Sequence, residues 1–151
     1  MNALNRRDLI AQGFALVAAG IWCRPAQADA PELAAAIRAW AGAATVRPGR
    51  VVLDVATLVE NGNSVDLTVR VDSPMTAADH VTAIALFNER NPQRDVATFA
   101  LGPRSGRAQV GTRIRLATSQ QLVALARLSD GSVWSHKVDV VVTLAACIEG
   151  E

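Results

Sequence analysis

The stretch ENGNSVDLTVRV, from Glu60 to Val71, decides the fold class. Valine or leucine occupies every second position from Val65 onward, and polar residues stand between them. Because successive side chains of a β-strand point to opposite faces, this alternation predicts a strand with one buried and one exposed face. The preceding ENGNS, Glu60 to Ser64, is typical of a hairpin turn, so we expect an antiparallel strand before it.

Similar β-rich runs continue along the chain on both sides of this stretch. Turn-forming sequences such as NERNP, GPRSG and SDGS separate them. The pattern predicts strands at 51–59, 65–72, 81–87, 95–101, 108–116, 122–128 and 133–144. About seven short strands at regular intervals favour an all-β fold, an immunoglobulin-like antiparallel β-sandwich, over residues 50–144. An up-and-down β-barrel is the alternative, and the length of 151 residues suggests one domain.

Residues 29–49 have a different pattern. In PELAAAIRAWAG, from Pro31 to Gly42, the apolar residues Leu33, Ile37 and Trp40 recur at helical spacing. A proline suits the first turn of a helix and a glycine suits its end. We therefore predict a short N-terminal helix, followed by VRPGR, residues 46–50, as a linker or turn.

The first 28 residues resemble an export signal. Twin arginines, Arg6 and Arg7, precede an apolar run from Leu9 to Trp22, and Ala26-Gln27-Ala28 gives the small-x-small pattern of a cleavage site. This order predicts a twin-arginine (Tat) signal peptide over residues 1–28, and an ordinary signal peptide is the alternative. The apolar run is shorter than the ~20 residues that span a bilayer, so we expect no membrane span and a periplasmic protein.

The composition excludes several classes of function. The 15 basic and 14 acidic residues nearly cancel, which argues against nucleic-acid binding. The two histidines, His80 and His136, have no second ligand at metal-binding spacing. GPRSGR, residues 102–107, stands between strands and reads as a turn, not as a phosphate-binding loop. We therefore expect no metal, no cofactor and no catalytic site in this chain.

One residue stands apart from this pattern. With Cys23 removed in the signal peptide, Cys147 is the only cysteine of the mature chain, which excludes an internal disulfide. A single cysteine in an oxidising compartment points to a reactive thiol or an intermolecular disulfide, or has no role. We expect residues 145–151 to form a mobile arm, because chain termini are usually mobile. Three residues beyond Leu144 give the thiol a reach of about 10 Å.

Several longer segments resemble one known family in sequence and in order. They are VENGNSVDLTVRVDSPMT (59–76), NERNPQRDVATF (88–99), SGRAQVGTRIRLATSQ (105–120) and LSDGSVW (128–134). With the twin-arginine start and the helix, they resemble the SoxY family, the cysteine-bearing carrier subunit of the bacterial sulfur-oxidation (Sox) system. The resemblance covers nearly the whole chain.

The resemblance implies a fold and a role. It implies a periplasmic immunoglobulin-like sandwich that forms a heterodimer with the small β-rich subunit SoxZ. Cys147 would be the covalent attachment point for sulfur intermediates. A haem enzyme would join thiosulfate to it, a hydrolase would release sulfate, and a sulfane dehydrogenase would oxidise the remaining sulfur. The carrier itself would be no enzyme and would need no cofactor.

The arm differs from the family pattern, which typically reads Gly-Gly-Cys-Gly-Gly. Here the residues around Cys147 are Ala145, Ala146, Ile148, Glu149 and Gly150. Alanine and the β-branched Ile148 restrict the backbone more than glycine does. The chain therefore has two further interpretations: a SoxY-like carrier for another substrate or pathway, or a structural subunit whose cysteine forms an interchain disulfide. A metal or redox chaperone is disfavoured by the scarcity of histidine and methionine.

Overall fold

The computed structural model describes residues 29–144, so the predicted signal peptide and the predicted arm lie outside the described residues. A helix, α2 (Asp29–Ala41), precedes a succession of strands. The strands are β1 (Val46–Pro48), β2 (Val51–Val55), β3 (Leu58–Asn61), β4 (Val65–Val71), β5 (Val81–Asn88), β6 (Asp95–Ala100), β7 (Gln109–Ile114), β8 (Gln120–Leu128) and β9 (Val133–Leu144). One turn of 3₁₀-helix, Pro103–Ser105, joins β6 to β7 within the predicted GPRSGR turn.

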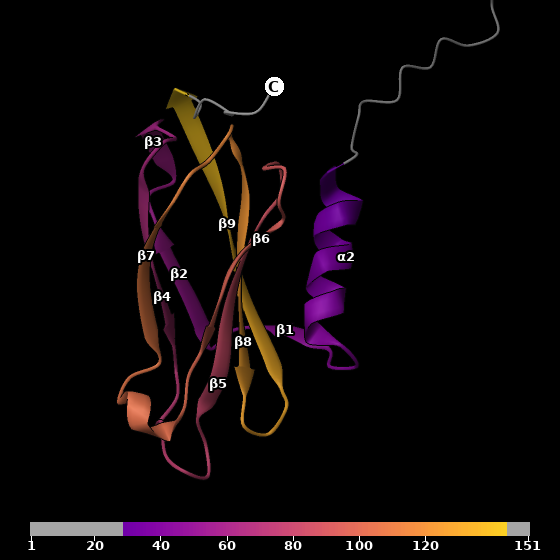
Figure 1. Cartoon of the computed structure of the whole chain (residues 1–151), viewed down its shortest axis with the longest axis vertical. Helices are drawn as coiled ribbons and strands as arrows, with labels where there is room; N and C mark the ends of the chain where they lie inside the picture. Colours follow the sequence, from indigo (N-terminus) through magenta and orange to yellow (C-terminus); the bar gives the residue numbers. More distant parts are fainter. Residues whose placement is uncertain (1–28, 145–151) are drawn as a thin grey trace, which may run out of the picture.

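The strands form two sheets that pack face to face, as a sandwich requires (Figure 1). The large sheet has the order β1-β9-β8-β5-β6, and β3 also pairs with β9. The small sheet has the order β2-β4-β7. The predicted all-β sandwich with a short N-terminal helix is confirmed. Most strand pairs are antiparallel as predicted, but β1 and β3 both pair with β9 in parallel.

The alternation in β4 places side chains as the sequence predicts. Its apolar residues are buried and its polar residues face solvent on the outer face of the small sheet. On that outer face Arg70 lies 3.0 Å from Asp54 of β2, and Arg113 of β7 lies 2.7 Å from Asp66. These ion pairs join all three strands of the small sheet. Its outer face is therefore polar and largely paired.

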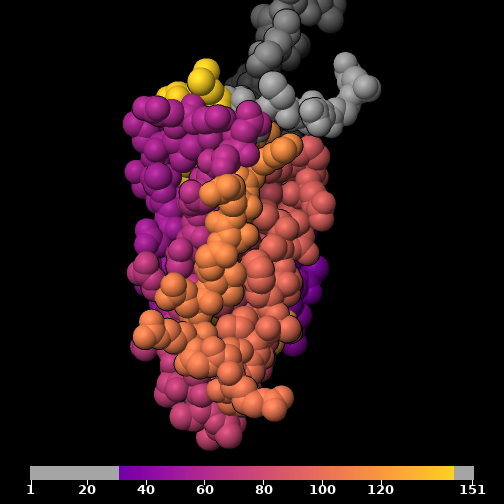
Figure 2. All heavy atoms as spheres, turned by 60° about the vertical axis from the view of Figure 1, so that its left-hand side comes forward, coloured from indigo at the N-terminus to yellow at the C-terminus, as the bar shows by residue number. Residues whose placement is uncertain are grey.

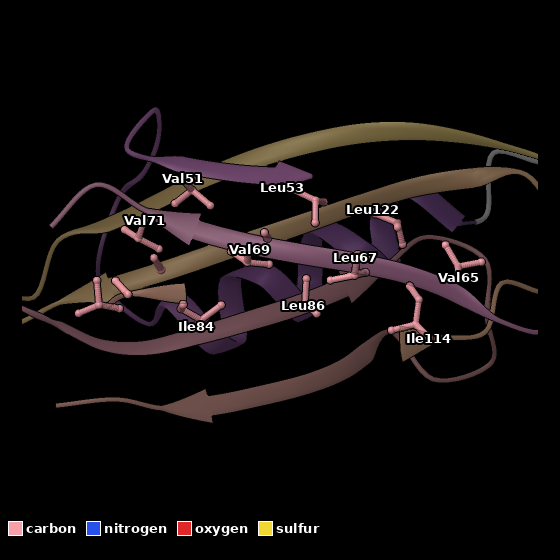
Figure 3. Close-up of a cluster of buried hydrophobic side chains, with 14 of the residues drawn as sticks. Val51, Leu53, Val65, Leu67, Val69, Val71, Ile84, Leu86, Ile114 and Leu122 are labelled. Atoms are coloured by element: carbon pink, nitrogen blue, oxygen red, sulfur yellow. The ribbon is translucent and has the colours of Figure 1, made fainter. Parts of the chain in front are cut away.

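The main core lies between the two sheets (Figure 3). Leu67 and Val69 of β4 face Ile84 and Leu86 of β5 and Leu122 of β8 across this space. These five side chains are almost completely buried. Burying a leucine or isoleucine side chain contributes about 1.5–3 kcal/mol, so this layer is the main source of stability.

Two predicted segments differ from the structure at the edge of β9. The run 51–59 is not one strand, because the chain crosses from the small sheet to the large sheet at Ala56 and Thr57. The turn after it therefore joins β3 to β4 in the other sheet, and the antiparallel partner of β4 is β2. The predicted linker 46–50 contains β1, whose parallel register with β9 pairs Val46 with Val133.

The helix packs on the outer face of the large sheet (Figure 1). Leu33 is buried among Phe87 of β5 and Val123 and Leu125 of β8. Trp40 meets Phe87 edge to face, with ring centroids 6.5 Å apart. The predicted helix is confirmed, although it begins two residues earlier than expected. No helix within residues 29–144 is long and apolar enough to cross a membrane.

Candidate functional site

The residues predicted to carry function, Ala145, Ala146, Cys147 and 148–150, lie outside the described residues. The structure does show the point from which they continue. This is the end of β9 from Val141 to Leu144, which we call the arm root. Figure 2 shows it (yellow) at one end of the molecule, beside the magenta surface of β3 and the turn after it.

Hydrogen bonds hold the arm root from two sides. The Leu144 carbonyl accepts a bond from Gly62 N–H at 2.9 Å, and the Gly62 carbonyl accepts one from Leu116 N–H at 2.8 Å. The Thr143 hydroxyl donates to the Glu60 carbonyl at 3.1 Å. On the other side the Ser119 hydroxyl oxygen accepts from Val142 N–H at 2.9 Å. The chain therefore leaves the sandwich from a fixed position.

The loop that carries Ser119 is fixed in turn by three side-chain amides, Asn88, Asn91 and Gln120, which we call the amide network. The Asn91 side-chain oxygen accepts from Ala117 N–H at 3.0 Å and from Gln120 Nε2 at 2.7 Å. Its amide nitrogen donates to the Arg115 carbonyl at 2.8 Å. Asn88 accepts from Asn91 N–H at 3.0 Å. The network thus ties the loop after β5 to the loop before β8.

Exposed apolar side chains lie on the arm root and on the strand beside it. Val141 is 53% exposed and its register partner on β3, Leu58, is 61% exposed. Leu144 is 67% exposed. Large apolar side chains on a strand are more often buried, and a local group of them on the surface suggests contact with another molecule.

The two histidines have structural roles. The backbone N–H of Leu53 donates to His136 Nδ1 at 2.9 Å, which links the small sheet to β9. His80 Nδ1 lies 3.0 Å from the Thr76 carbonyl. Among residues 29–144 no group of three or more His, Cys, Asp or Glu side chains is arranged to hold a metal ion.

The shifted pKa values also have local structural causes. Hydrogen bonds from Ser132 lower the pKa of the Asp130 carboxyl in the turn between β8 and β9. A side-chain hydrogen bond with Asp66 raises the pKa of Arg113 on the small sheet. Both groups lie on the protein surface, and their shifts come mainly from a hydrogen bond with one neighbour, with a smaller contribution from Arg50 and Arg47 at Asp130. Such shifts are typical of turns and ion pairs and not of an active site.

The sequence did not single out the amide network, although all three residues lie in the segments that carry the family resemblance. Asn88 and Asn91 read as turn formers, and Gln120 reads as the start of a strand. The available signal in the sequence was the polar Gln120 at the start of an apolar run. The structure leaves it only 5% exposed, and a buried polar side chain needs hydrogen-bond partners.

Comparison with solved structures supports both the fold and the family. The chain is similar to the sulfur carrier protein SoxY from Chlorobium limicola f thiosulfatophilum, with 28% sequence identity and a TM-score of 0.65. That match covers 76% of this chain and 99% of the other.

More distant structures share the fold alone. A superoxide reductase (neelaredoxin) from Ignicoccus hospitalis is 19% identical, with a TM-score of 0.55, over 62% of this chain and 80% of the other. Superoxide reductase from Nanoarchaeum equitans is 11% identical, with a TM-score of 0.55, over 64% of this chain and 100% of the other. No curated protein matches the chain significantly.

The model of one protein family, described as sulfur oxidation protein SoxY, matches residues 37–147. The matched range runs from within α2, through both sheets and the arm root, to Cys147. By this match and the shared fold, the chain belongs to the SoxY family of sulfur-oxidation proteins.

Proposed function

We propose that this protein carries sulfur intermediates covalently on Cys147 and presents them to the enzymes of a sulfur-oxidation system. The observation that carries the proposal is the family match, which extends through the arm root to residue 147. Membership of the family supports a carrier and not an enzyme. The fixed arm root fits this role, because it holds the start of the arm at a defined place on a rigid body.

The chemistry at Cys147 follows from the properties of a thiolate, the form of cysteine that acts as nucleophile. Its sulfur joins the outer sulfur of thiosulfate, and the two electrons released pass to a haem enzyme. Hydrolysis then breaks the bond between the outer sulfur and the sulfonate. Water supplies the fourth oxygen of the sulfate that leaves, and a persulfide remains on Cys147 for a sulfane dehydrogenase to oxidise.

Attachment to one body makes each step effectively intramolecular once the arm has entered an enzyme. A short tether raises the local concentration of the intermediate to about the millimolar range without any new contact. From the carbonyl-anchored Leu144, three residues span about 10 Å, so the thiol can enter only a shallow cleft. The enzyme must therefore come close to the end of the sandwich at which the arm root lies.

The setting follows from the rest of the sequence. The twin-arginine segment supports export to the periplasm, and the family supports a heterodimer with a SoxZ-like subunit. The alanines and Ile148 beside the cysteine favour a carrier whose enzymes accept a bulkier arm than the glycine-rich one. A substrate other than thiosulfate is the second form of the proposal.

Intact-mass spectrometry tests the proposal directly. The mature protein is purified without reductant from cells that are oxidising thiosulfate, together with Cys147→Ala as the matched control. We expect thiosulfonate and persulfide adducts on the parent chain, and the parent mass alone on the variant. A complete interchain disulfide through Cys147, with no sulfur adduct, would instead establish the structural subunit. Adducts of another mass would identify a different cargo.

A further inference from the structure

The helix α2 covers only part of the outer face of the large sheet. It packs on β5 and β8, and beside it the outward-facing side chains of β9 are exposed from Lys137 to the end of the strand. A cavity of about 610 Å³ lies between the helix and this uncovered face. Ile37, Val123 and Leu125 give it an apolar floor, and Arg38 and Lys137 stand on its lining. A second cavity of about 160 Å³ also includes Ile37 and Lys137, so the two adjoin.

The uncovered face continues from this cavity to the arm root. Side chains two residues apart on a strand share a face, so Lys137, Asp139 and Val141 lie on one line along β9. Lys137 and Val141 are four residues apart, which corresponds to about 13 Å. Leu58 extends the apolar part onto β3 beside Val141. We call the cavity together with Lys137, Val141 and Leu58 the exposed strip.

Two carboxylates lie near the cations of the exposed strip, but both have other partners. Glu89 lines the second cavity, where it accepts a hydrogen bond from Gln121 N–H at 3.1 Å and lies 3.9 Å from Arg90. Among residues 29–144 no salt bridge joins Arg38 or Lys137 to a carboxylate, and Asp139 is instead hydrogen-bonded to Gln121 at 3.0 Å. The outer face of the small sheet, by contrast, carries ion pairs across all three of its strands. The outer face of the small sheet thus carries ion pairs and one exposed valine, Val52, whereas the outer face of the large sheet has an apolar hollow beside two cations.

We propose that the exposed strip is the docking surface for the second subunit of the carrier. That subunit inserts an apolar side chain into the cavity, covers Val141 and Leu58, and places a carboxylate near Arg38 and Lys137. This inference rests on the proposed heterodimer and adds to it the face that is used. It also places the partner directly beside the arm root.

The shape of the exposed strip favours this occupant over two others. A small amphiphilic anion could fill the cavity, but it would leave Val141 and Leu58 in water. In a two-fold dimer the same surface patches meet, so a second copy would bring the exposed strip against itself. It would also bring the same two cations, Arg38 and Lys137, into the contact from both copies, and like charges close together disfavour association. A protein of different surface shape, with an acidic residue, meets both requirements.

Binding of matched variants tests the docking face. Val141→Glu places a negative charge on the exposed strip, whereas Val52→Glu places the same charge on the small sheet, where Val52 is 51% exposed. The affinity of each for the SoxZ-like subunit of the same organism is measured by titration calorimetry. We expect Val141→Glu to weaken binding at least about tenfold and Val52→Glu to leave it unchanged. The reverse order would overturn the proposal.

Acylation of lysine in the unsubstituted chain tests the docking face without any mutation, so a folding defect cannot affect the result. Lys137 is the only lysine of the protein, so an amine-acylating reagent reports this single side chain and the N-terminal amine. Mass spectrometry follows its labelling with and without the subunit. We expect complex formation to slow labelling of Lys137 about tenfold. An unchanged rate in a formed complex would show that the subunit docks elsewhere.

These outcomes separate the docking face from the proposed function. If the parent chain binds the subunit but Val141→Glu binds equally well, only the docking face is overturned. If the parent chain does not bind the SoxZ-like subunit, the proposed heterodimer is wrong as well. The adducts on Cys147 still test the carrier function independently. If light scattering shows that the chain alone dimerises and that Val141→Glu abolishes the dimer without affecting the heterodimer, the strip belongs to a second copy and the proposal is wrong.

Discussion

Replacing Asn91 by alanine should weaken the end of the sandwich from which the arm continues. The substitution removes three side-chain hydrogen bonds, with Ala117 N–H, Gln120 Nε2 and the Arg115 carbonyl. Gln120 keeps its bond to the Thr118 carbonyl at 3.1 Å, so its amide nitrogen retains one partner. The effect is therefore confined to the link between the loop after β5 and the loop before β8.

The magnitude follows from these three bonds. A hydrogen bond contributes about 0.5–1.5 kcal/mol net, so three bonds would total about 1.5–4.5 kcal/mol. Asn91 is only half-buried, and water can reach the freed groups in part. We therefore expect the free energy of unfolding to fall by about 2–3 kcal/mol. With a urea dependence of about 1.5–2 kcal/mol per molar, the unfolding midpoint falls by about 1–2 M.

Urea unfolding under reducing conditions measures this change, and hydrogen exchange locates it. The Ala117 amide should exchange faster in Asn91→Ala, because its acceptor is lost. Asn61→Ala is the matched control: Asn61 accepts one exposed bond, from Asn63 N–H at 2.9 Å, and its loss should cost about 0.5 kcal/mol or less. Equal small losses for both variants, with no change at Ala117, would refute the role assigned to the amide network.

Three further perturbations test other parts of the structure. His136→Ala removes the acceptor for Leu53 N–H and should cost about 1 kcal/mol in urea unfolding; an unchanged midpoint would show that water replaces the ring. Phe87→Ala should cost about 3–5 kcal/mol and shift the Trp40 fluorescence, because the ring is buried and supports α2; a normal spectrum would contradict that support. The pKa of Asp130 is lowered in the folded protein, so its negative charge stabilises the fold at any pH above the usual aspartate pKa of about 3.9. This stabilisation is lost as the pH falls through the lower pKa of the folded state. The stability difference between the parent chain and Asp130→Asn should therefore be present at pH 7 and vanish near pH 2, and a difference independent of pH would contradict it.

Local sequence patterns predicted the elements whose environment is itself local. The alternation from Val65 to Val71 gave the buried and exposed faces of β4, because side-chain direction in a strand has a period of two. The spacing of Leu33, Ile37 and Trp40 gave the helix and the side that packs on the sheet. In both cases the pattern repeats within the segment that it describes.

Long-range pairing was beyond these patterns. β3 pairs with β9, with Leu58 opposite Val141. Nothing within residues 51–59 indicates a partner so far along the chain. The crossing at Ala56 and Thr57 is stabilised by a bond from Val141 N–H to the Thr57 carbonyl at 2.8 Å, which is equally distant in sequence. A continuous β-rich run was therefore a sound prediction of strand content but not of its division.

The candidate site divides in the same way. The sequence gives the position of Cys147 and predicts that it is the only cysteine left after removal of the signal peptide, whereas the groups that fix the arm root were not evident from it. Ser119 and the amide network act through contacts between loops that only the folded chain brings together. The uncovered face of β9 depends on where α2 settles, which the helix sequence alone does not determine.

The flanking of β9 on both edges has a mechanical consequence. Each withdrawal of the proposed arm from an enzyme cleft pulls on the C-terminal end of this strand. Hydrogen bonds to β8 on one edge, and to β1 and β3 on the other, run across the direction of the pull. A force along the strand loads many of these hydrogen bonds in shear at the same time. A force across the strand would instead break them one after another. The strand that would transmit this force, β9, is paired with other strands along both edges. We therefore expect the sandwich to resist repeated pulling on its C-terminal end.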